Sequence, residues 1–337
     1  MLLRKFRQSG PDVMILTVII LIFTWLGSFL HPRLPSAQGF DEMPMPLFSL
    51  LLSVSSFSAF FSVFTAFLLV LLIAYLLVNF NTSSFFISER TFLPAVVFIL
   101  LAALFPEYQL LSPVLPAAVF LILAIRTIVE SYKVHGTAYS FFDAGVLIGI
   151  GSLFYAPLIW MGLILFAGIL ILRTVNLREI IISIFGLATP LFIVYGILYV
   201  AGKNMQDQLS VVSWNLFGRE TGYTVSEIKL ALMITAGVLI LIAAVHLLQV
   251  LNMKKVKSRK TFSLLLWTFF ITLGITLFFG SVSAEIYCLL IIPPSYIITH
   301  YFVFSKAKRF PGIMMAILFL IAAAAQVLPL VPRLWYH

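Results

Sequence analysis

Long, uninterrupted apolar runs separated by short polar segments make up most of this chain. The runs are continuous and do not alternate apolar with polar residues, so they indicate helices and not strands. A helix needs about 20 apolar residues to cross a bilayer. We predict helical spans over the ranges 13–30, 47–79, 92–106, 114–129, 141–155, 157–173, 180–201, 228–250, 262–279, 286–304 and 312–332. The expected fold is an all-α, polytopic transmembrane helical bundle in which residues 1–337 form a single integral membrane domain.

Two of the runs allow a second interpretation. The run over 47–79 is too long for one straight crossing. It is either a short interfacial helix over 47–56 followed by a span, or two crossings. The run over 141–173 carries Tyr155-Ala156-Pro157 at its middle. Because proline starts or breaks a helix, this run is either two short crossings or one kinked crossing.

The composition supports a membrane protein. Hydrophobic residues make up 62% of the 337 residues and charged residues only 10%, whereas soluble domains carry about 25% charged residues. So little charge cannot cover a water-exposed surface, which excludes a cytosolic enzyme, a secreted module and a disordered chain. The net charge of +9 comes from basic residues in short loops, where they act as topology signals. We therefore expect no nucleic acid among the partners.

Basic residues also predict the direction of each crossing, because they are enriched in cytoplasmic loops. With the N-terminus inside, one crossing at 47–79 and two at 141–173, the inside segments hold 16 of the 21 basic residues. The outside then holds Arg33, Lys203, Arg219, Lys229 and Arg333. A single crossing at 141–173 would place the basic run over 254–260 outside, against the rule. The sequence therefore predicts eleven spans, with the N-terminus inside and the C-terminus outside.

Two outer loops and one outer turn contain the side chains that could carry chemistry. The loops are 31–46 and 202–226, and the turn is Phe105-Pro106-Glu107-Tyr108. A carboxylate can act as general base for an incoming hydroxyl group, and a basic side chain can hold a leaving phosphate. The catalytic candidates are Asp41, Glu42 and Glu107, and the phosphate-binding candidates are Arg33, Lys203 and Arg219. The alternative is that these residues are polar only because outer loops touch water.

Other polar residues predict neither a metal nor a cofactor. His135, His246 and His300 lie toward the inner side, but they come from three separate elements without HxxxH or HxxH spacing. Cys288 lies in an apolar run and behaves as a small hydrophobic residue. Asp143 lies just inside another apolar run, where a carboxylate either begins a helix or is a functional candidate; a helix start is the favoured interpretation.

Several short motifs carry a family resemblance. They are Leu104-Phe105-Pro106-Glu107, Phe142-Asp143-Ala144-Gly145, Ser152-Leu153-Phe154-Tyr155-Ala156-Pro157, Asn176-Leu177-Arg178-Glu179 and the pair Gly186 and Pro190. Together they resemble a domain-of-unknown-function family of Gram-negative inner-membrane proteins. The resemblance implies a multi-pass protein of the bacterial inner membrane and implies no activity.

The layout also looks, more distantly, like the GT-C class of polyprenyl-phosphate-dependent glycosyltransferases. That class has an acidic residue in the first outer loop, often a second acid in the next, and phosphate-binding basic residues further on. The resemblance would assign these roles to Asp41 or Glu42, to Glu107, and to Lys203 or Arg219. The first outer loop here is shorter than in that class.

Three functions follow as hypotheses. The first is a GT-C-like protein that handles a polyprenyl-phosphate-linked sugar at the outer face, with membrane lipid as its partner. The second, ranked nearly level, is a non-enzymatic membrane subunit that packs against envelope proteins through small and aromatic residues. The third is a lipid or small-molecule transporter, which the scarcity of charge within the runs makes least favoured.

Overall fold

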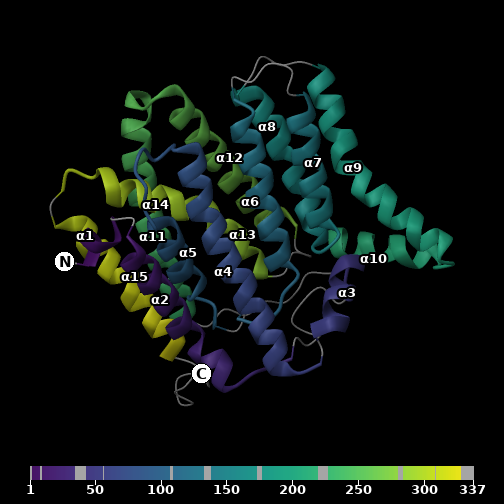
Figure 1. Cartoon of the computed structure of the whole chain (residues 1–337), viewed down its shortest axis with the longest axis horizontal. Coiled ribbons are helices and arrows are strands. Elements are labelled where there is room, and N and C mark those ends of the chain that lie inside the picture. The colour runs from purple at the N-terminus through teal and green to yellow at the C-terminus, as the bar shows by residue number, and fades with distance from the viewer. Residues whose placement is uncertain are drawn as a thin grey trace.

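The computed structural model describes residues 2–7, 10–34, 43–55, 57–106, 109–132, 138–172, 177–218, 227–279, 284–307 and 309–327. Within these ranges all regular secondary structure is helical (Figure 1). The α-helices are α1 (Leu2–Phe6), α2 (Pro11–Leu30), α3 (Pro46–Ser55), α4 (Ala59–Ser84), α5 (Leu93–Ala102), α6 (Val114–Glu130), α7 (Ala138–Ser152), α8 (Leu163–Leu172), α9 (Leu177–Val200), α10 (Met205–Phe217), α11 (Glu227–Val250), α12 (Val256–Phe278), α13 (Tyr287–Leu290), α14 (Ile292–Phe304) and α15 (Phe310–Val327). The 3-10 helices are η2 (Ala156–Gly162), η3 (Leu251–Met253) and η4 (Ala284–Ile286).

Seven helical segments of the described chain are long and apolar enough to cross a membrane. They are Pro11–Leu30, Ala59–Ser84, Leu177–Val200, Glu227–Met253, Val256–Phe278, Tyr287–Phe304 and Phe310–Val327. Further apolar helices are shorter, among them α3, α5, α7 and the combined η2–α8 segment. The all-α fold of a multi-pass membrane protein is therefore confirmed, and most predicted runs correspond to helices within a few residues.

The connections between helices gather at two ends of the bundle (Figure 1). At the end that holds α1, the Thr91 hydroxyl donates to the carbonyl of Phe6 across 2.9 Å. At the same end Lys260 Nζ, in the first turn of α12, donates to the carbonyl of Leu172 at the end of α8 across 3.1 Å. We call this the N-terminal end.

Contacts at the opposite end join another set of connections. The Leu47 backbone N–H of α3 donates to the carbonyl of Leu153 after α7 across 3.1 Å. Asn215 Nδ2 of α10 donates to the carbonyl of Met43 before α3 across 2.8 Å. We call this the cavity end, because the cavity described below lies there.

The core of the bundle is built from short central helices. Every residue of α5 from Leu93 to Leu101 is buried, and α14 is buried from Ile292 to Phe302. Only 17% of the apolar window of α9, and likewise of α11, is buried, so these long helices leave much of their apolar surface partly or fully exposed. In a bilayer, lipid covers such surfaces, so exposed leucine, isoleucine and phenylalanine on these helices are the expected lipid-facing residues.

The run over 141–173 forms two helices that fold back on each other. A Cβ on Gly168, in α8, would lie 3.4 Å from the Phe141 ring at the start of α7. Gly151, at the end of α7, faces the Leu158 side chain at the start of η2. The two legs are therefore antiparallel, which agrees with the favoured prediction of two elements and excludes one kinked helix. The chain reverses at Phe154 and Tyr155, directly before Pro157.

The run over 47–79 is also divided. The helix α3 ends at Ser55, and Ser58 caps α4 by accepting a hydrogen bond from the backbone N–H of Phe61 across 3.1 Å. A short helix followed by one long helix was one of the two predicted alternatives. The helix α10 was not predicted, since the sequence was interpreted there as an outer loop over 202–226. Asn204 caps it by accepting from the N–H of Gln206.

The helix-start role predicted for Asp143 is wrong. The helix α7 begins at Ala138 and carries no acidic residue in its first turn. Asp143 lies in the second turn with an exposed side chain, because the preceding residues Ala138 to Phe142 already form the start of the helix.

Small residues bring α7 and α9 into close contact. A Cβ on Gly145 would lie 2.6 Å from the carbonyl oxygen of Ser183, and one on Gly149 would lie 2.5 Å from that of Leu187. Gly186 in turn faces the Phe142 carbonyl. Later residues of α7 contact later residues of α9, so the two helices run parallel. Gly145 and Gly149 have the small-xxx-small spacing that permits close backbone approach in membranes.

Candidate functional site

A small cavity of about 50 Å³ lies at the cavity end, between α2, α4, α5, α6 and the η4–α13 segment. Its lining residues are Trp25, Val70, Phe98, Ala102, Phe105, Gln109, Ser112, Leu115, Glu285, Tyr287, Cys288 and Ile291. One water needs roughly 10–15 Å³ of such space, so the cavity has room for a few waters or for one small group of a larger ligand. Its lining is mainly aromatic and aliphatic, and three polar side chains interrupt it.

Glu285 is the acidic member of that lining. It lies in η4, its side chain is 2% exposed, and it stands among Tyr287, Phe105 and Trp25. Removing a carboxylate from water is costly unless other groups compensate. A buried carboxylate in a cavity at the end of a membrane bundle is therefore a candidate for proton transfer or ligand binding.

Gln109 fixes the segment that closes the cavity on one side. Its Nε2 donates to the carbonyl of Thr24 and its Oε1 accepts from the Ser28 hydroxyl, each across 3.0 Å. Both partners belong to α2, so the amide holds the start of the 109–113 segment against that helix. The buried Ser112 follows on the same segment and also lines the cavity.

Two stacked aromatic rings line the same cavity, and a lysine lies over one of them. The rings of Phe105 and Tyr287 stack with centroids 4.8 Å apart and an interplanar angle of 7°. The ammonium of Lys229, in the first turn of α11, lies 5.3 Å from the centroid of Phe105. A cation over an aromatic face is attracted by the ring quadrupole, which keeps positive charge near the cavity.

This cavity has room for one small group, such as a hydroxyl, beside a carboxylate. A carboxylate within reach of a hydroxyl accepts its proton, and an ammonium nearby stabilises anionic oxygens. Both effects are stronger in an apolar surrounding than in water.

Two of the predicted site residues fall within the described chain, and the structure does not bring them together. Arg33 follows the end of α2 and Lys203 follows the end of α9, and both side chains are exposed. The helices α2 and α9 stand on opposite flanks of the bundle (Figure 1). The remaining candidates, Asp41, Glu42, Glu107 and Arg219, lie outside the described residues. Their roles stay predictions.

Glu285 was missed by sequence reasoning, although a signal was present. The residue directly precedes the apolar run over 286–304. A carboxylate at the boundary of a membrane helix is a functional candidate; the same rule singled out Asp143. The two long outer loops hold several charged residues each, so they gave a stronger signal in the sequence than the single carboxylate of Glu285.

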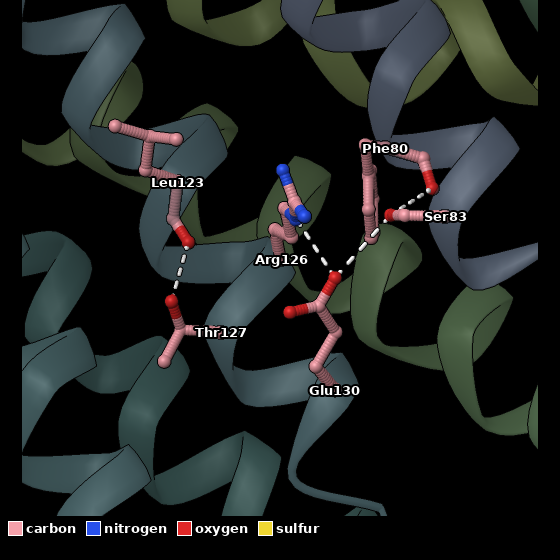
Figure 2. Close-up of polar contacts among 6 residues, drawn as sticks. All are labelled: Phe80, Ser83, Leu123, Arg126, Thr127 and Glu130. Carbon is pink, nitrogen blue, oxygen red and sulfur yellow. Dashed lines mark hydrogen bonds and ion pairs between the residues drawn. The ribbon is translucent and has the colours of Figure 1, made fainter.

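A polar cluster at the N-terminal end joins two helices. Arg126 Nε lies 2.7 Å from Glu130 Oε1, an i, i+4 ion pair along α6, and the Ser83 hydroxyl of α4 donates to the same oxygen across 3.3 Å (Figure 2). Thr127 donates back to the Leu123 carbonyl of its own helix (Figure 2). The ion pair is partly exposed, so it anchors a helix end and joins α6 to α4.

The structure also brings together two of the histidines that sequence reasoning kept apart. The rings of His246, in α11, and His300, in α14, have centroids 6.0 Å apart. His135 lies outside the described residues. Among the residues that are described, no group of three or more histidine, cysteine, aspartate or glutamate side chains could hold a metal ion.

Fold and site together define a class: an all-α, multi-pass membrane protein with a small carboxylate-containing cavity at one end of its bundle. The chain belongs to the family of unknown function DUF6427, whose sequence profile matches residues 40–327. This confirms the resemblance to a domain-of-unknown-function family. No curated protein and no solved structure matches the chain.

Proposed function

We propose that this protein is a multi-pass protein of the bacterial inner membrane that acts on a phosphate-linked lipid at its outer face. Its chain crosses eleven times, with the N-terminus inside and the C-terminus outside. In this proposal the short helices α5, α7 and η2–α8 count as crossings. Their alternating directions and the gathering of connections at two ends support this count.

The distribution of basic residues supports the orientation. Of the basic residues within the described ranges, Arg33, Lys203 and Lys229 lie at the cavity end, and the others lie at the N-terminal end. By the positive-inside rule the N-terminal end then faces the cytoplasm. The cavity consequently opens toward the outer leaflet, where polyprenyl-phosphate-linked sugars are presented to GT-C enzymes.

The single observation that carries the chemical part is the buried carboxylate of Glu285 in its cavity, which is also lined by Phe105, the ring that the Lys229 ammonium contacts. Glu285 accepts the proton of an attacking hydroxyl, and positive charge at the same end stabilises the departing phosphate. Asp41, Glu42 and Glu107 remain candidates for the same proton transfer, and Arg33, Lys203 and Arg219 for phosphate binding.

Replacing Glu285 tests the proposal. The variant Glu285→Gln keeps the size of the side chain and removes its ability to accept a proton. We expect about a 10²–10⁴-fold loss of product formation, the usual contribution of a general base. The measurement is mass spectrometry of lipid-linked saccharides extracted from the native host, at matched protein level.

The matched control is Glu130→Gln, which removes a partly exposed carboxylate at the opposite end. We expect unchanged products in that strain. Normal lipid-linked products in the Glu285→Gln strain would contradict the proposed chemistry. The double variant Asp41→Ala/Glu42→Ala is measured in the same way. Loss of products in this strain, but not in the Glu285→Gln strain, would assign the proton transfer to the first outer loop.

Normal lipid-linked products in the Glu285→Gln strain would favour a second function, that of a non-enzymatic subunit of an envelope complex. One observation supports it. After Pro190 no residue of α9 is buried, and Gly196 has no atom within 4 Å of an added Cβ. This half of α9 presents an exposed apolar face that includes Phe192, Ile193 and Ile197, and a small residue such as Gly196 lets a partner helix approach.

A further inference from the structure

One fully buried and one partly exposed histidine at the N-terminal end hold buried nitrogens that have no hydrogen-bond partner among the described residues. His300 is 0% exposed. Neither its Nδ1 nor its Nε2, nor the buried Nδ1 of His246, has a hydrogen-bond partner among the residues that the structure describes. These three nitrogens come from two neighbouring rings, whose centroids lie 6.0 Å apart and whose planes are tilted by 46°.

Unpartnered polar atoms of this kind need an explanation. Nearly all buried polar groups in proteins are hydrogen-bonded, and the explanations for an exception are strain, a catalytic or redox role, or an ion or a water at the site. An imidazole in an apolar surrounding loses its hydrogen bonds to water at a cost in free energy. A ligand bound to both rings would compensate this loss for His246 in α11 and for His300 in α14.

We propose that His246 and His300 bind one transition-metal ion between their rings, in the two-coordinate arrangement that copper(I) adopts. Imidazole nitrogens bind first-row metals at about 2 Å. Two rings bound on opposite sides of one ion then have centroids about 6 Å apart, which is the spacing observed. A direct hydrogen bond between the rings would need them closer, with nitrogens about 3 Å apart.

The surroundings favour an ion of low charge. Aromatic rings enclose the pair: Phe262 and Phe304 lie 5.1 and 4.8 Å from the His300 ring, and Tyr301 lies 5.0 Å from that of His246. Ring faces attract cations, but within the described chain no carboxylate or thiolate completes a three-ligand group with the histidines. Two neutral ligands in an apolar site therefore suit a monovalent ion better than a divalent one.

Lys254 is the charged group closest to this assembly along the packed side chains. Its Nζ lies 3.3 Å from the centroid of Phe304, the ring that contacts His300. This ammonium repels a bound cation, which is a further reason for an ion of low charge.

The experiment is a competition for copper(I). The full chain, purified in mild detergent under anaerobic conditions, is titrated against the coloured copper(I)–bicinchoninate complex. We expect the protein to withdraw one equivalent of copper(I). The variants His246→Ala and His300→Ala should each lose this uptake, whereas His31→Ala, which removes an exposed histidine after α2 at the opposite end, should keep it.

Because His300 is fully buried, its replacement also removes packing. The partly exposed His246 gives the cleaner variant, and an X-ray absorption spectrum of the loaded protein gives a second readout. Two nitrogen ligands at about 2 Å are expected. No copper uptake by the unaltered protein, unchanged uptake in both variants, or a spectrum with four oxygen or nitrogen ligands would overturn the proposal. In the first case a bridging water remains as the occupant.

This inference does not depend on the proposed function. The histidines lie at the N-terminal end, and the carboxylate cavity lies at the other. Loss of copper binding with normal lipid chemistry, or the reverse, would separate the two proposals.

Discussion

Hydroxyl groups inside the bundle are satisfied mainly by their own helices, and one tyrosine is an exception. Thr268 and Thr272 donate to carbonyls four residues earlier in α12, a common way to bury a hydroxyl within a membrane helix. The fully buried Tyr296 instead donates from α14 to the Leu77 carbonyl of α4 across 2.8 Å. This bond joins two helices that are distant in sequence.

We expect Tyr296→Phe to destabilise the protein by about 1 kcal/mol, the usual net value of one buried hydrogen bond. The ring remains and keeps its contacts with Phe80 and Phe86, so packing is preserved. The control Tyr139→Phe alters a tyrosine that is 71% exposed. Thermal unfolding in detergent measures both variants, and equal melting temperatures for the two would contradict an interhelical role for the Tyr296 hydroxyl.

Residue-scale chemistry was the hardest part to predict from sequence. Glu285 and Gln109 meet across 176 positions of the chain only because α2, α6 and η4 converge at one end. Similarly, His246 and His300 become neighbours through the packing of α11 on α14. No local spacing in the sequence identifies such long-range neighbours. The Arg126–Glu130 pair differs, because both residues lie on one helix at the i, i+4 spacing that brings side chains together.

The helices that the sequence predicted well are those whose position is set by a long apolar run alone. Apolar runs such as 228–250 and 312–332 correspond to α11 and α15, because a helix satisfies its own backbone in lipid. The helix α10 was missed because its mixed polar and apolar residues resemble a loop, and its Asn204 cap is a short signal. Proline correctly marked the reversal before Pro157, yet Pro190 lies inside α9 without ending it.

The close packing between α7 and α9 predicts which glycine of α9 does not tolerate a larger side chain. Leucine at Gly186 would place its Cβ against the Phe142 carbonyl, so we expect Gly186→Leu to separate the helices and lower the melting temperature. Gly196 lies ten residues further along α9, and a Cβ there meets nothing within 4 Å, so Gly196→Leu should behave as the unaltered protein. Thermal unfolding and limited proteolysis in detergent compare the two, and equal behaviour would contradict close α7–α9 packing.

At the scale of the whole molecule, basic residues and helix directions agree on two distinct ends. The contacts of Thr91 with Phe6 and of Lys260 with Leu172 join segments that the charge rule assigned to the inside. The contact of Asn215 with Met43 joins segments assigned to the outside. The distribution of basic residues and the contacts between helices are independent observations, so their agreement supports the proposed direction of each crossing.

Threading is directly testable with single cysteines. In a Cys288→Ser background, Arg33→Cys and Lys203→Cys place thiols at the cavity end, and Lys255→Cys places one in the turn between α11 and α12. All three positions are exposed, so differences in labelling report sidedness and not burial. In intact spheroplasts we expect a membrane-impermeant maleimide to label the first two and to label Lys255→Cys only after lysis. Labelling of Lys255→Cys before lysis would reverse the orientation and remove the cavity from the outer leaflet, while labelling of Arg33→Cys without Lys203→Cys would change the number of crossings between them.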